Sequence, residues 1–156
     1  MSTLNDWQVE SLRLTLFRSA ITDQIVPLWE NLTREKPVTV DSQPRMNMLR
    51  EQGPTSFGTL VHLSNPLRID WCLIPSQESQ QNDVALPVLG PFAQVMVHFF
   101  TLMSQWIGSE NIPRIKRIAL GSILLLPADT KVSAYKQLDS FLPHVQIDIE
   151  NSYDFQ

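Results

Sequence analysis

The sequence lacks several features on which catalytic and metal sites usually depend. Its single cysteine, Cys72, excludes an intrachain disulfide and a thiolate metal site, and this low cysteine content fits a cytoplasmic protein. The five glycines never cluster, so no glycine-rich phosphate loop is expected, and no G-x-S-x-G sequence occurs. The three histidines do not have the spacing of zinc ligands. We therefore predict no catalytic residues, no metal and no cofactor, which favours a protein that is not an enzyme.

Charged residues are missing from one long stretch, Val84 to Ser109, which raises the question of a membrane span. Four polar residues argue against a span, because their spacing of i, i+4, i+7 and i+11 places them in one stripe of a helix. These residues are Gln94, His98, Thr101 and Gln105. We predict a long helix over about 91–107 that is buried on most sides, with Phe100 in the core. The polar stripe is its candidate interaction seam.

Overall composition is that of a globular protein with few charges. The 156 residues are 43% hydrophobic and 18% charged, and they include four tryptophans and seven phenylalanines. So much apolar surface with so little charge favours a protein that covers part of its surface with a partner. The net charge of −4 disfavours general binding to nucleic acids. The first ten residues have no secretory signal pattern, so we expect a cytoplasmic protein with no membrane segment.

The first third of the chain predicts a strand, a helix and a polar loop. Alternating residues over 9–17 indicate a half-buried strand, with Arg13 and Thr15 on its polar face. The apolar spacing that follows predicts a helix from Thr22 to the proline at position 37, and a short strand over 38–40. Residues 41–54 are polar, and we predict that they form a long loop.

A hairpin is the best-defined local feature of the sequence. Two apolar segments, 57–63 and 67–74, are separated by three residues, which predicts antiparallel strands that pair Leu63 with Leu67. In this register one face of the hairpin is almost wholly apolar. The opposite face carries His62, Arg68 and Asp70 as a candidate polar cluster, with Cys72 too far from His62 to act as a nucleophile.

The last third predicts a strand over 115–126, a helix over about 129–142 and a final strand pattern over 145–150. Because residues 123–126 are apolar on both faces, we place the 115–126 strand centrally in the sheet. Its start carries three basic residues, which could contact phosphate: Arg114, Lys116 and Arg117. Residues 144–156 form either a terminal strand or the start of a second region.

These elements predict an α+β fold, with one mainly antiparallel sheet of about five strands and helices on one face. Residues 1–156 then form a single domain, which could be the N-terminal part of a longer protein. The predicted core consists of the long helix and the apolar face of the hairpin.

The order of elements resembles that of a sporadically distributed, uncharacterised family of bacterial proteins. Three segments carry the resemblance: the hairpin strands 60–63 and 67–71, the aromatic helix through Phe99, Phe100 and Trp106, and the basic strand 113–121. Members of that family have Arg-hydrophobic-Gly-Leu-Arg in the basic strand, and this chain departs from the pattern with Ala119. The resemblance implies a longer protein, and no catalytic residues are carried over by it.

The leading hypothesis is a non-catalytic protein–protein interaction or scaffold subunit of a bacterial assembly, bound to a protein partner or to further copies. One alternative is an enzyme or small-ligand-binding domain, with its site between the hairpin and the long helix. A second alternative is a nucleic-acid accessory protein that contacts phosphate through the basic strand and Arg68.

Overall fold

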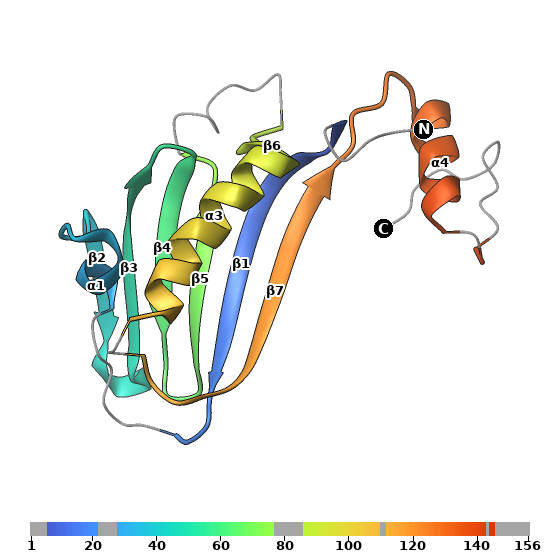
Figure 1. Cartoon of the computed structure of the whole chain (residues 1–156). Coiled ribbons are helices and arrows are strands. Elements are labelled where there is room, and N and C mark those ends of the chain that lie inside the picture. Colours follow the sequence, from blue (N-terminus) through green and yellow to red (C-terminus); the bar gives the residue numbers. More distant parts are fainter. Residues whose placement is uncertain (1–5, 22–27, 77–85, 110–111, 143, 146–156) are drawn as a thin grey trace. The chain divides into compact units, whose positions relative to one another are not determined.

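The computed structural model describes residues 6–21, 28–76, 86–109, 112–142 and 144–145. It shows an α+β protein whose strands form an open antiparallel sheet (Figure 1). The chain divides into two compact units, Met1–Leu125 and Leu126–Gln156. The first unit contains the whole sheet, and each unit is described by itself below.

Seven strands make up the sheet, which is two more than the sequence predicts. The sheet runs in the order β2-β3-β4-β5-β1-β7, and the two-residue β6 pairs with the start of β1 beside β5. All described pairs are antiparallel. The strands are β1 (Gln8–Arg18), β2 (Thr39–Gln43), β3 (Met48–Thr55), β4 (Gly58–Ser64), β5 (Arg68–Ile74), β6 (Gly90–Pro91) and β7 (Ile115–Leu125).

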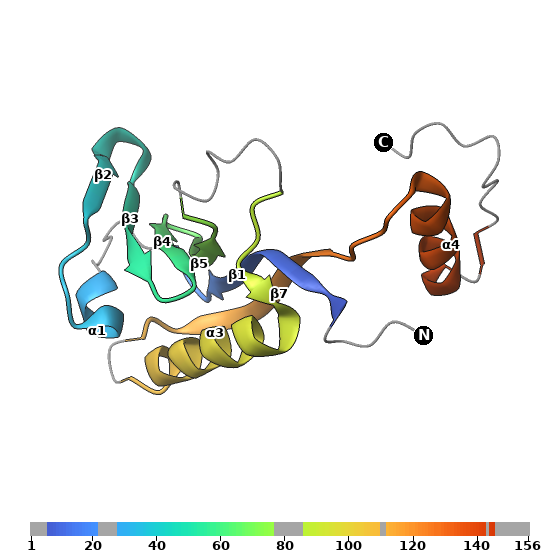
Figure 2. The same ribbon diagram turned by 90° about the horizontal axis from the view of Figure 1, so that it is seen from above.

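The two faces of the sheet differ because β1 and β5 alternate apolar and polar residues. Leu14 and Leu16 of β1 pair with Trp71 and Ile69 of β5, and all four side chains are buried on the face that carries the helices. Helices α1 (Trp29–Thr33) and α3 (Phe92–Ile107) lie on this same face (Figure 2). We call it the helix face and the opposite one the open face.

Helix α3 is amphipathic rather than buried on most sides. Its buried residues form one stripe of Val95, Phe99, Met103 and Trp106. The side chain of Phe100, predicted in the core, is 45% exposed. The prediction was wrong because a single helix lies against one face of the sheet, so only about a third of its circumference can be covered. The apolar residues on its outer side remain in contact with solvent.

Strand β3 replaces most of the loop predicted over 41–54. The inward positions of β3 are Leu49, Glu51 and Gly53, so only one of them is a large apolar residue and the usual alternation is absent. Gly53 is required for packing, because a Cβ atom there would lie 2.8 Å from the Trp29 ring. The first predicted helix is represented by α1 alone, since residues 22–27 lie outside the described part of the chain.

The β4–β5 hairpin forms in a different register from the predicted one. Leu63 pairs with Asp70 rather than with Leu67, and Ser64 pairs with Ile69. Asn65 determines this turn, because its Oδ1 atom accepts hydrogen bonds from the backbone N–H groups of Leu67 and Arg68. The change in register moves the side chains of β4 to the face opposite the predicted one.

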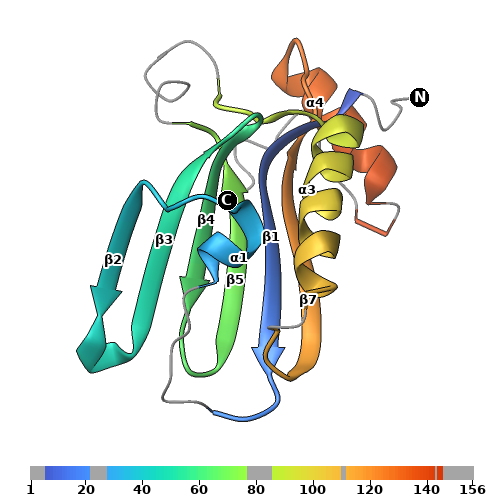
Figure 3. The same cartoon turned by 60° about the vertical axis from the view of Figure 1, so that its left-hand side comes forward.

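Strand β7 lies at an edge of the sheet, although the sequence predicts a central position (Figure 3). It pairs with β1 along its length, and no described strand pairs with its other side. The second unit contains α4 (Lys131–Phe141), whose N-terminus is capped reciprocally by Thr130 and Ser133. Of the predicted final strand, 145–150, all residues after Val145 lie outside the described part of the chain.

Candidate functional site

The polar cluster on the hairpin retains the predicted Arg68 and Asp70 but has Arg13 and Thr15 of β1 in place of His62. On the open face, the buried carboxylate of Asp70 accepts hydrogen bonds from Arg13 and Thr15 of β1. Arg68 completes the cluster, with its Nε atom 2.9 Å from the other Asp70 oxygen. The β1 alternation already places Arg13 and Thr15 on a polar face, but their pairing with Asp70 depends on the order of the strands.

His62, the third residue of the predicted cluster, lies on the helix face because of the changed register. Its Nδ1 atom is 2.8 Å from a Glu51 oxygen, and its ring stacks on Trp71 at a centroid distance of 4.5 Å. Both His62 and Glu51 are buried, and the Nε2 atom has no hydrogen-bond partner among the described residues. With no solvent access, this pair belongs to the core and offers no site to a substrate.

Cys72 lies on the open face beside the Asp70 cluster. Burial raises the pKa of its thiol, an effect that Arg13 opposes and Asp70 reinforces. At neutral pH the side chain is therefore the protonated thiol, which is a poor nucleophile. His62 lies on the opposite face, so it does not pair with Cys72.

The predicted seam of α3 is mainly exposed to solvent. Gln94, Thr101 and Gln105 are exposed to solvent, and the Thr101 hydroxyl donates to the Val97 carbonyl of its own helix. His98 is half-buried, and its ring lies 4.6 Å from that of Phe57 at the β3–β4 turn. Gln94, Thr101 and Gln105 thus form a solvated side of the helix, whereas His98 packs against Phe57. None of the four converges with Asp70, which lies on the open face.

Of the three predicted basic residues, Lys116 and Arg117 lie among the first residues of β7 and Arg114 directly precedes the strand. The Arg114 carbonyl accepts a hydrogen bond from the Ser19 N–H, and Lys116 lies at an irregularity where the register with β1 shifts. The guanidinium of Arg117 lies 4.1 Å above the ring of Phe17. Lys116, Arg117 and Phe17 line an open cavity of about 240 Å³. Arg68 belongs to β5 and is separated from this group by the width of β1.

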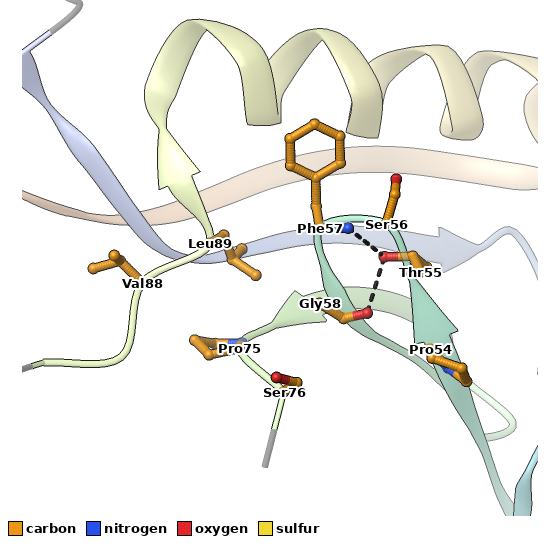
Figure 4. A pocket seen from close by; sticks show the side chains of 9 residues that line it. All are labelled: Pro54, Thr55, Ser56, Phe57, Gly58, Pro75, Ser76, Val88 and Leu89. Atoms are coloured by element: carbon orange, nitrogen blue, oxygen red, sulfur yellow. Dashed lines mark hydrogen bonds between the residues drawn. The ribbon is translucent and has the colours of Figure 1, made fainter. Parts of the chain in front are cut away.

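A second cavity of about 320 Å³ lies where the β3–β4 turn meets the end of β5 (Figure 4). The Thr55 hydroxyl stabilises this turn, accepting from the Phe57 N–H and donating to the Gly58 carbonyl. Gly58 has a φ of 152°, and a Cβ atom there would lie 2.4 Å from the Ile74 carbonyl oxygen. None of the described lining residues is ionisable, so the cavity shows no group for acid–base chemistry.

The two edges of the sheet have opposite characters. Strand β2 is five residues long, fully exposed and mainly polar, which is the usual protection of a natural edge. Strand β7 has eleven residues, and its helix-face side chains Ile118 and Leu120 are 51% and 43% exposed. Long apolar edge strands are rare in proteins that do not pair them with another strand.

At this edge the backbone of β7 presents hydrogen-bonding groups that pair with no described strand. In β1 the Arg18 N–H bonds toward β5, and the Ser19 N–H bonds toward β7. The directions of the backbone groups alternate along a strand, so those of Thr15 point toward β7, as those of Ser19 do. Thr15 therefore exchanges hydrogen bonds with its partner Ala119. The N–H and C=O groups of Ile118 and Leu120 therefore point away from β1, toward the open edge.

Among the described residues there is no cluster of side chains suited to a metal ion, and no helix has the length and apolar character needed to cross a membrane. Comparisons of the chain with protein-family models, curated proteins and solved structures give no match. The open edge of β7, together with the basic residues at its start, is therefore the candidate interaction surface.

Proposed function

We propose that the protein is a non-catalytic protein–protein interaction module that binds an extended segment of a partner protein along the open edge of β7. In this mode the partner adds a strand to the sheet, and its main chain pairs with the outward backbone groups of Ile118 and Leu120. The observation that carries the proposal is the contrast between the short, polar β2 edge and the longer β7 edge, whose residues 118–125 are all uncharged.

The apolar side chains near the edge support strand addition. Ile118 and Leu120 lie on the helix face of β7, and α3 leaves both of them partly exposed. A partner strand would place its own side chains beside them at a cross-strand distance of roughly 5 Å. Burial of this surface adds a hydrophobic contribution to the main-chain hydrogen bonds.

Amide hydrogen exchange tests the proposal residue by residue. The probe is a capped ten-residue peptide of alternating threonine and valine. In the free protein the amides of Arg117 and Ala119 should exchange slowly and those of Ile118 and Leu120 quickly. On addition of the peptide, the amides of Ile118 and Leu120 should become protected. The proposal is overturned if these two amides stay unprotected with peptide, or if protection in the free protein rises with its concentration, which would indicate pairing with a second copy.

Two proline variants provide matched controls. Leu120→Pro removes an outward N–H, so it should abolish peptide binding and leave thermal unfolding nearly unchanged. Ala119→Pro removes an N–H that bonds to β1, so it should destabilise the sheet itself. Equal destabilisation by the two variants would contradict the assigned direction of the β7 backbone groups.

A further inference from the structure

The cavity lined by Phe17, Lys116 and Arg117 lies at the first residues of β7, where a strand paired along the open edge would end or begin. We infer that this cavity receives a carboxylate side chain of the partner segment, so that the partner is an apolar strand with acidic residues at its C-terminal end. The inference rests on the proposed function, because it names the chemistry of the segment that binds at β7.

Charge is the first observation behind the inference. From residue 112 to residue 128 the charged residues are Arg114, Lys116 and Arg117, and no carboxylate occurs among them. In the described part of the chain neither Lys116 nor Arg117 forms an ion pair, whereas Arg68 and Arg13 both form ion pairs with Asp70. Among the described residues, the positive charge of Lys116 and Arg117 is thus not paired with a carboxylate, in a protein of net charge −4.

Geometry is the second observation. Arg117 is held in place by stacking on Phe17, so its guanidinium loses less conformational freedom when it binds an anion. A residue of the added strand that faces Arg117 on the open face would have its Cβ atom about 5 Å away, within reach of an ion pair. The cavity provides room for the carboxylate beside both cations.

Strand direction identifies which end of the partner is acidic. Every described pair in this sheet is antiparallel. In an antiparallel addition the C-terminal end of the partner lies beside the first residues of β7. A second copy pairing through its own β7 would instead place uncharged Leu124 and Leu125 against these cations, leaving them without a partner.

The test uses three capped peptides that share the alternating threonine–valine pattern. One is neutral, one has two glutamates at its C-terminal end, and one has the same glutamates at its N-terminal end. Because each exposed ion pair adds little, the C-terminal glutamates should tighten the Kd on the order of fivefold at low salt. The gain should disappear at about 0.5 M salt, where exposed charges are screened.

Charge variants test whether Lys116 and Arg117 cause the gain in affinity from the C-terminal glutamates. Arg117→Gln and Lys116→Gln should each reduce the gain, whereas Arg45→Gln, which removes an exposed cation elsewhere in the chain, should leave it unchanged. Equal binding of all three peptides would overturn this inference while leaving strand addition intact. Failure of every peptide to protect the Ile118 and Leu120 amides would overturn the proposed function. Displacement of the acidic peptide by a short oligothymidine would assign the cations to phosphate and also overturn the inference.

Discussion

The Nδ1 atom of His62 lies 2.8 Å from a carboxylate oxygen of Glu51, across the β3–β4 pair in the middle of the helix face. Both side chains are buried, and the indole ring of Trp71 lies against the imidazole. A polar pair in this position makes the alignment of β3 with β4 specific, because a shift of β4 by one residue would turn His62 to the open face and leave Glu51 buried without its partner.

Breaking this pair from one side should be costly. His62→Leu leaves the Glu51 carboxyl group buried without a hydrogen-bond partner, and we expect a loss of about 3–5 kcal/mol in the free energy of unfolding. The double variant with Glu51→Leu should be less destabilised than the sum of the single variants. Urea unfolding of the four proteins measures this coupling, and additive losses would show that the two side chains act independently.

The Asp70 carboxylate should contribute to stability through its partners on β1. Asp70→Asn weakens the contacts with Arg13 and Arg68, both of which keep access to water, so a loss of about 1–3 kcal/mol is expected. Asp41 is an exposed carboxylate of β2 and provides the control, since Asp41→Asn should change stability by less than about 0.5 kcal/mol. Chemical denaturation measures both, and equal effects would contradict a structural role for Asp70.

Neighbouring phenylalanines of α3 should respond very differently to truncation. Phe99 is completely buried, and Phe99→Ala should cost about 3–5 kcal/mol by leaving a cavity in the core. Phe100 is 45% exposed, and Phe100→Ala should cost less than about 1 kcal/mol. Thermal unfolding of the two variants tests which side of the helix faces the sheet. A larger effect at Phe100 would mean that the helix is rotated.

Cys72 should react slowly with alkylating reagents near neutral pH, because burial raises the pKa of its thiol. Asp70→Asn removes a negative charge that adds to this shift, so the reaction with iodoacetamide should become faster at a given pH. Since the folded protein holds the thiol proton more tightly, its stability should fall as the pH rises through the ordinary thiol pKa. Cys72→Ser should lose this part of the pH dependence. Alkylation of the native protein as fast as that of the unfolded chain would contradict the predicted burial.

The sequence could predict elements whose side chains alternate clearly. Strand β1 and helix α3 are examples, since their apolar residues recur with periods of about two and about four. Strand β3 could not be predicted, because Glu51 and Gly53 occupy its inward positions. A glutamate is buried there only because His62 is opposite it, and a glycine only because the Trp29 ring fills the space.

The candidate site, too, could be predicted from the sequence only in part. The basic residues at the start of β7 are evident from the sequence, but their significance depends on the strand being at an edge. Apolar residues on both faces of a strand usually indicate a central position, because such side chains are normally covered. In this fold β1 pairs with β5 on one side and with β7 on the other, and no further described strand follows β7.

The sequence by itself therefore determined the α+β class, the antiparallel hairpin and the position of the long helix, because these depend on local periodicity and residue type. Only the tertiary structure decided which face His62 occupies, which residues surround Asp70 and which strand is left open. Those features depend on the register and order of strands that are distant in the chain. A one-residue change in register reverses the direction of every side chain, and no local pattern specifies which strand comes last in the sheet.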